Sequence, residues 1–163
     1  MHYCRGEYVQ ARAAFQVAQD LSDDATLRAK VLLNLGILAN IAGDFEEAKA
    51  SYARSRLSFQ LAGDRAGEAL ALHNLGMVHA DLHQWDEADE AFRQCLELCE
   101  EQGNRPLIGS VLVNRSEVHC ARGRYDEAVA DCDLAISIAK ESGAEVQPLG
   151  SALARVTRVP GNG

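Results

Sequence analysis

The stretch of sequence that decides the fold is NLGILANIAGDFEEAKASY, residues 34–52, because its pattern occurs twice more along the chain. It returns as NLGMVHADLHQWDEADEAF at residues 74–92 and, more loosely, as NRSEVHCARGRYDEAVADC at residues 114–132. Each step is 40 positions, without insertion or deletion between the copies. A fixed period of this size is typical of repeat architectures, in which every repeat is one small structural unit. The chain is therefore expected to be built from stacked copies of one motif.

Each copy contains two segments whose apolar residues recur with the period of a helix. Leu32, Leu35 and Ala39 share one face of the first segment, and Phe45 and Tyr52 share one face of the second. Spacings of three and four residues predict amphipathic helices. The repeat therefore predicts an all-α protein with two antiparallel helices per unit. The expected helices are residues 7–21, 25–41, 45–62, 66–81, 85–102, 106–121 and 125–142.

Residues at the ends of these segments have the chemistry of helix termini. Asp44 can cap the second helix of its unit, with Glu47 three residues later. Gly63, Gly103 and Gly143 stand where a left-handed residue would close the second helices. These residues set the expected helix boundaries.

The repeat resembles the tetratricopeptide repeat. The resemblance lies in a small residue in the first helix (Gly36), a Gly-x-aromatic turn (Gly43 to Phe45), then Ala48 and a second aromatic, Tyr52. That family commonly repeats every 34 or so residues, and the extra six resemble the longer variety found in kinesin light chains and bacterial regulatory proteins. The resemblance covers about residues 2–142. It implies a right-handed superhelix of antiparallel helical hairpins, a tetratricopeptide-like solenoid.

The repeats predict one domain, because no hairpin buries its apolar face alone. The expected single domain spans residues 1–158, followed by a tail at 159–163. Its parts are a partial unit at 1–21, full units at 25–62, 66–102 and 106–142, and a capping helix at 146–158. Because the partial unit begins at the end of a hairpin's first helix, the sequence is expected to be a piece of a longer protein.

Composition narrows the classes of partner. The net charge is −8 and no run of basic residues is present, which argues against binding a phosphate backbone. No apolar stretch is long enough to cross a bilayer, and the first residues lack the apolar core of a signal peptide. The five cysteines include no Cys-x-x-Cys pair, so reduced thiols are expected. The interpretation is a cytoplasmic protein with no nucleic-acid or membrane partner.

The candidate binding residues are centred on Asn34, Asn74 and Asn114, which occupy one repeat position. The resemblance implies that this position faces a concave groove and holds the backbone of a bound peptide, which suits an amide because it both donates and accepts hydrogen bonds. The neighbours on the same faces complete the expected groove: Lys30, Ile37, Ile41, Leu70, His73, Met77, Asp81, Ser110, Val113 and Glu117. The alternative is that each Asn caps or bridges neighbouring helices, or is simply solvated.

The function expected from these residues is a docking scaffold that holds a partner protein or peptide in this groove, as part of a larger signalling or regulatory protein. The groove lacks a dense Lys/Arg cluster, so an extended or helical segment with apolar anchors is favoured over an acidic tail. There is no Gly-rich phosphate loop and no Gly-x-Ser-x-Gly motif. The chain is therefore expected not to be an enzyme and to need no cofactor.

Two other functions compete with docking. The open first hairpin, with Tyr8 and Phe15, could associate with a second copy of the chain. Alternatively, His79 and His83 are spaced i and i+4, which on one helix face could bind zinc. His119 shares the repeat position of His79, which favours a packing role and no metal site.

The third full unit departs from the pattern of the other two. Arg115 and Ser116 replace the Leu-Gly pair, and Cys132 replaces the second aromatic. This unit is therefore expected to pack less tightly than the others.

Overall fold

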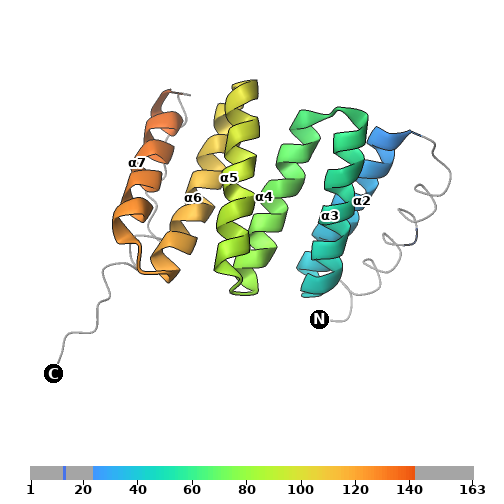
Figure 1. The fold of residues 1–163 in the computed structure, drawn as a ribbon, viewed down its shortest axis with the longest axis horizontal. Coiled ribbons are helices and arrows are strands. Elements are labelled where there is room, and N and C mark those ends of the chain that lie inside the picture. Colours follow the sequence, from blue (N-terminus) through green and yellow to red (C-terminus); the bar gives the residue numbers. More distant parts are fainter. Residues whose placement is uncertain (1–12, 14–23, 142–163) are drawn as a thin grey trace. The chain divides into compact units, whose positions relative to one another are not determined.

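The computed structural model describes Ala13 and residues 24–141 of the chain. The expected helix at 7–21, the capping helix at 146–158 and Gly143 lie outside the described residues, as do Tyr8 and Phe15. Within residues 24–141 the structure has six helices and no strand (Figure 1). Their bounds are α2 (Ala25–Ile41), α3 (Phe45–Ala62), α4 (Arg65–Asp81), α5 (Trp85–Gln102), α6 (Arg105–Ala121) and α7 (Tyr125–Glu141). The all-α prediction is confirmed, with these helix ends within one residue of those expected from the repeat.

Four of the described helices, α2, α3, α4 and α6, begin where a side chain accepts a hydrogen bond from a first-turn amide group, whereas α5 begins without such a bond. The Asp44 carboxylate accepts a hydrogen bond from the Glu47 amide, and Asp64 does the same for Gly67. At the other end, Gly63 and Gly103 have φ angles of 70° and 64°, so they close α3 and α5 in the left-handed conformation. The predicted boundary chemistry is therefore present at these helix ends.

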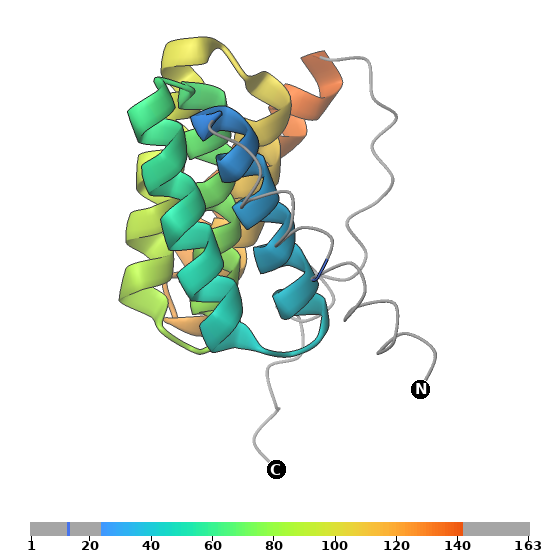
Figure 2. The same ribbon diagram turned by 90° about the vertical axis from the view of Figure 1, so that its right-hand side faces the viewer.

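The chain divides into two compact units at the boundary between Gly103 and Asn104. The described part of the first unit holds α2 to α5, in which α2 pairs with α3, α4 pairs with α5, and α3 packs against α4. Helix α2 also contacts α4, so the two first helices of this unit are neighbours. Figure 2 shows the hairpin of α2 and α3 with its helices side by side. The described part of the second unit is the hairpin of α6 and α7.

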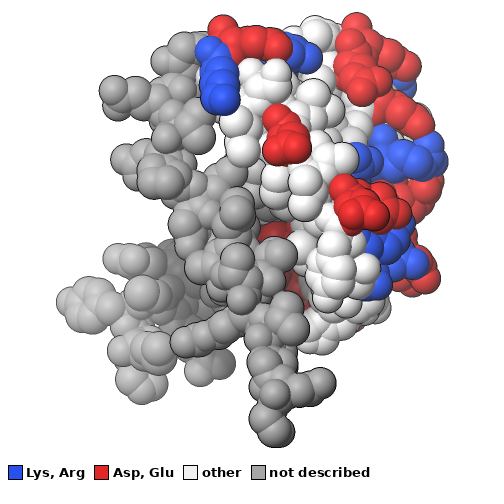
Figure 3. All heavy atoms as spheres, turned by 90° about the vertical axis from the view of Figure 1, so that its left-hand side faces the viewer, with Lys and Arg blue, Asp and Glu red and all other residues white. Residues whose placement is uncertain are grey.

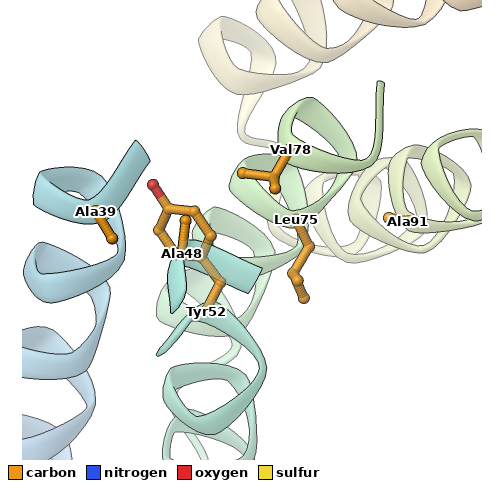
Figure 4. Close-up of a cluster of buried hydrophobic side chains, with 6 residues drawn as sticks. All are labelled: Ala39, Ala48, Tyr52, Leu75, Val78 and Ala91. Carbon is orange, nitrogen blue, oxygen red and sulfur yellow. The ribbon is translucent and has the colours of Figure 1, made fainter. Parts of the chain in front are cut away.

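Aromatic rings lie directly over glycines inside the first two hairpins. A Cβ atom added to Gly36 would lie 2.5 Å from the Tyr52 ring, and one added to Gly76 would lie 2.4 Å from the Phe92 ring. Both rings are almost completely buried. The ring of Tyr52 belongs to a cluster that joins the two hairpins of the first unit (Figure 4). Its buried members are Ala39, Ala48, Tyr52, Leu75, Val78 and Ala91.

The departures of the third hairpin occur in matched pairs. Ser116 stands at the glycine position, and Cys132, 16 residues later, stands where the other hairpins have the ring. Arg115 replaces leucine, and its guanidinium makes hydrogen bonds of 2.8 and 2.6 Å to the carboxylate of Asp131. Asp131 in turn replaces Ser51 and Ala91 of the other hairpins. Each substitution on α6 is thus accompanied by a complementary one on α7.

Candidate protein-docking surface

The expected groove residues all lie on the first helix of a hairpin, and none of their side chains is buried. Lys30, Asn34, Ile37 and Ile41 lie on α2, and Leu70, His73, Asn74, Met77 and Asp81 lie on α4. Ser110, Val113, Asn114 and Glu117 lie on α6, in the second unit. Residues between them on each helix, such as Leu35, Leu75 and Leu112, are buried and form the hairpin cores. The helical period thus separates a core face from an accessible face on each first helix.

The accessible faces of α2 and α4, here called the first-helix surface, expose apolar side chains. Ile41 is 78% exposed, Leu70 41% and Ile37 38%, while Met77 is half-buried. Large apolar side chains at this level of exposure gain free energy when a partner covers them. The two helices belong to one unit and are in contact, so these side chains form part of one surface.

The amides of Asn34 and Asn74 are available on this surface. Asn34 is exposed and Asn74 is half-buried, and neither side chain has a hydrogen-bond partner among the residues that the structure describes. They therefore do not bridge the helices within that part of the chain. Asn114, on α6, is half-buried and does take part in an interaction within the chain. The three asparagines share a repeat position but differ in their surroundings.

Charged and titratable groups are sparse on the first-helix surface. Lys30 lies near the N-terminal end of α2 and Asp81 at the C-terminal end of α4, and both are exposed. The His73 ring lies 6.1 Å from that of Phe92, centroid to centroid, and burial lowers the pKa of this imidazole. His73 is therefore neutral at neutral pH, and the middle of the surface carries no charge from it.

The structure bears on the alternative, disfavoured from the sequence, that His79 and His83 bind zinc together. Helix α4 ends at Asp81, and His83 lies beyond it with a φ of 58°, in the left-handed region. The His83 ring packs 5.0 Å from that of Trp85, whereas Nδ1 of His79 lies 2.7 Å from Oε1 of Gln84. The two imidazoles are therefore not on one helix face, which removes the geometry that the zinc alternative required. Among residues 24–141 no three His, Cys, Asp or Glu side chains are grouped so as to hold a metal ion.

A cavity of about 200 Å³ between α3, α4 and α5 was not expected from the sequence. Several of its polar side chains bond to each other: Arg56 donates to Gln94 at 2.8 Å, and Arg65 donates to Glu101 at 2.5 Å. The buried carboxylate of Glu68 accepts a bond of 2.5 Å from Gln60. These pairs serve the packing of the unit, and could not be foreseen because they join residues up to 38 positions apart.

The surface charges and the helix compositions bear on nucleic acid and membrane as classes of partner. On the face drawn in Figure 3, Lys and Arg side chains lie beside Asp and Glu side chains. In the part of the chain that the structure describes, no helix is long and apolar enough to cross a membrane.

The helical-repeat fold, together with the family and relatives that follow, supports a scaffold for protein–protein interaction. The chain belongs to the tetratricopeptide repeat family: two models of this repeat match residues 27–101 and 109–142. Among curated proteins it is 28% identical over 127 residues to Regulatory protein AfsR of Streptomyces griseus, which covers 78% of this chain. It is 23% identical over 116 residues, 70% of this chain, to Protein KINESIN LIGHT CHAIN-RELATED 3 of Arabidopsis thaliana. The resemblance to the longer repeat variety is thereby confirmed.

Solved structures show the same fold. Aspartyl phosphate phosphatase F from Bacillus subtilis matches with a TM-score of 0.77 at 14% identity, covering 88% of this chain and 37% of that one. BtubC (BKLC) from P. vanneervenii matches with a TM-score of 0.74 at 23% identity, covering 88% of this chain and 61% of that one. The chain spans only 13% and 18% of the lengths of the two curated relatives. The similarity therefore shows the fold of this chain, and the functions of those whole proteins are not assigned to it.

Proposed function

We propose that the chain docks a segment of a partner protein on the first-helix surface, with the Asn34 and Asn74 amides bonding to the backbone of that segment. The observation that supports this most directly is that both amides lack a hydrogen-bond partner among the described residues while standing beside exposed apolar side chains. An amide presents a donor and an acceptor together, which matches a peptide group whatever its side chain. The surface therefore suits an extended or helical segment.

Affinity for such a segment would come chiefly from the apolar side chains. Ile37, Ile41 and Leu70 are each at least 38% exposed, and covering a large aliphatic side chain completely contributes roughly 1.5–3 kcal/mol. A hydrogen bond to an amide adds about 1 kcal/mol. We therefore expect apolar anchors in the partner to provide most of the binding free energy and the amides to fix its position.

The rest of the functional proposal follows from this role. Holding a segment in place requires neither a catalytic group nor a cofactor, so we propose that the chain is a non-enzymatic docking module. Its similarity to a small part of a regulatory protein and of a kinesin light chain-related protein supports a place within a larger protein. We propose a cytoplasmic setting and a regulatory role there. Within the second unit, we propose that the accessible face of α6, with Ser110, Val113, Asn114 and Glu117, also contacts a partner segment.

The test is a selection from a displayed random-peptide library on the wild-type chain, followed by fluorescence anisotropy with the selected peptides in solution. The Asn34→Ala, Asn74→Ala double variant should weaken binding about 30-fold, the equivalent of two lost hydrogen bonds. Ile41→Glu should weaken it at least as much, because it places a charge at the expected apolar anchor. Leu61→Glu, on the exposed side of α3, is the matched control and should bind as wild type does.

Circular dichroism must show that each variant keeps its helicity. Because Asn34 and Asn74 make no bond to the described residues and Ala has the higher helix propensity, the double variant should be at least as stable as wild type. The proposal fails if selected peptides bind equally to wild type, the double Asn variant and Ile41→Glu. It also fails if the library yields no binder.

A further inference from the structure

The outward side of α3 carries an apolar stripe that the docking function does not use. Ala50, Ala53, Leu57 and Leu61, here called the α3 stripe, are all exposed. Leu57 is 59% exposed and Leu61 is 87% exposed, the highest value among the large apolar side chains of the described residues. Spacings of three and four residues place the four on one face of the helix. The buried residues of α3, including Tyr52, lie on its other side.

The neighbouring hairpin shows that the fold does not need apolar residues at these positions. One repeat later, α5 carries Glu90, Arg93, Glu97 and Glu101 at the four corresponding positions. Arg93 forms ion pairs with both Glu90 and Glu97, and Glu101 pairs with Arg65 of α4. The outward face of a second helix can therefore be charged and solvated. The packing of the hairpin does not explain why the α3 stripe is apolar, whereas an interaction outside the hairpin would explain it.

Leu61 also stands where the other two hairpins are closed by an ion pair. Arg65 and Glu101 form that pair in the hairpin of α4 and α5, and Arg105 and Glu141 form it in the hairpin of α6 and α7. In the hairpin of α2 and α3 the corresponding residues are Ala25 and Leu61. The first hairpin thus lacks the pair and exposes a leucine instead.

We propose that the α3 stripe pairs with the same stripe of a second copy of this chain, the two helices running antiparallel about a two-fold axis. In that arrangement Ala50 faces Leu61 of the partner copy, and Ala53 faces Leu57 of the partner copy, because both pairs are nearly symmetric about residue 55. Each large side chain then meets a small one, which lets helices interdigitate closely. A two-fold interface requires this kind of self-complementary pattern.

Charge also favours a second copy at this helix. Helix α3 holds two Glu against one Lys and two Arg, a net charge of +1, whereas α5 holds seven acidic residues and one Arg, a net charge of −6. The second helix of the remaining hairpin, α7, has five acidic residues and one Lys, a net charge of −4. Two copies of a chain with net charge −8 repel each other. Among these three second helices, that repulsion is smallest where α3 faces α3, and much larger for α5 or α7.

The dimer should be weak. A stable interface buries about 800 Å² on each partner, and one exposed helix stripe provides less than that. We therefore expect a dissociation constant of about 0.1 mM, corresponding to a binding free energy of roughly −5.5 kcal/mol. This surface is separate from the first-helix surface, so the proposal stands whether or not a peptide binds there.

Sedimentation velocity of the wild-type chain tests the proposal, over concentrations from about 10 μM to 1 mM that bracket the expected dissociation constant. The sedimentation coefficient should rise with concentration toward that of a dimer. The Leu57→Glu, Leu61→Glu double variant, which gives α3 the residues that α5 has at these positions, should stay monomeric throughout. Ile41→Glu places the same charge on the first-helix surface and should dimerise as wild type does.

Three outcomes would overturn the proposal. They are a monomeric wild type over the whole range, a dimer that persists in the double Glu variant, and a dimer that is lost in Ile41→Glu as completely as in the double variant. If the double variant loses helicity, Leu61→Gln alone replaces it, because that position is 87% exposed. Leu61→Gln should then raise the dissociation constant at least 5-fold, and an unchanged constant would count equally against the proposal.

Discussion

Replacing Gly76 by serine tests the claim that the ring of Phe92 is what forces a glycine into α4. A Cβ atom at this position would lie 2.4, 2.6 and 2.9 Å from three atoms of the ring. Ordinary contacts between carbon atoms are about 3.5–4.0 Å, so the ring would have to move by roughly 1 Å. Phe92 is completely buried, and its neighbours leave it little freedom to move. We expect Gly76→Ser to lower the free energy of unfolding by about 2 kcal/mol, within the range for an overpacked core.

The third hairpin of the chain supplies the compensating change. It has Ser116 and Cys132 at the positions of Gly76 and Phe92. Phe92→Cys alone should lower the free energy of unfolding by about 3 kcal/mol, because it leaves a cavity. In the double variant the serine no longer meets a ring, so the combined loss should be about 3 kcal/mol and not the additive sum of about 5 kcal/mol.

The measurement is urea unfolding followed by far-UV circular dichroism, with the m-value checked for each variant because repeat proteins can lose cooperativity. Gly109→Ser in α6 is the matched control. A Cβ atom there would meet only a methyl group of Ile138, at 3.6 Å, so this change should be neutral or stabilising by a few tenths of a kcal/mol. If the losses of Gly76→Ser and Phe92→Cys add to within about 0.5 kcal/mol, the two positions are not coupled. The steric explanation would then be wrong.

The other predictions concern charges and thiols. Asp131→Ala should destabilise the chain by about 3 kcal/mol, because it removes the carboxylate that pairs with the partly buried guanidinium of Arg115, and adding Arg115→Leu should recover most of the loss in urea unfolding. Hydrogen bonds from Arg93 and Gln94 lower the pKa of Glu90 to about 2. This carboxylate therefore stabilises the folded state above its ordinary pKa and loses that effect as the pH falls toward 2. An NMR titration that finds Glu90 protonating near pH 4 would contradict this. Burial raises the pKa of the Cys95 thiol, so it should not react with a thiol reagent until the chain unfolds.

The helices could be predicted from the sequence because their causes are local. Apolar residues at helical spacing, Asp44 at a helix start and Gly63 at a helix end act within a few positions of one another. The repeat added long-range information, since three copies of one pattern imply that they pair in the same way. Sequence spacing alone is a weak guide at His79 and His83, because α4 ends at Asp81 and the left-handed turn at His83 keeps the two rings off one helix face.

The candidate docking surface could be predicted only in part. The period assigns Asn34 and Asn74 to the side of each helix away from its buried leucines, and the structure agrees that both are accessible. Whether an amide at such a position is already bonded depends on side chains from other helices. Asn114 occupies the same repeat position and is engaged within the chain, which the sequence pattern does not distinguish.

By itself, the sequence determined the class of fold and the helix boundaries. It also indicated which side chains lie on a core face and which on an accessible face, because the period of a helix places each residue on one side of it. Only the tertiary structure decided which departures from the pattern belong together. From the sequence, Arg115 is a departure with no visible counterpart, and the hairpin places its guanidinium 2.6 Å from the carboxylate of Asp131, 16 residues away. The α3 stripe could likewise be identified as an exposed surface only from the structure, since residues with the same apolar spacing in a buried helix would form part of the core. Distances between helices and access to solvent are properties of the packed chain, and no local pattern contains them.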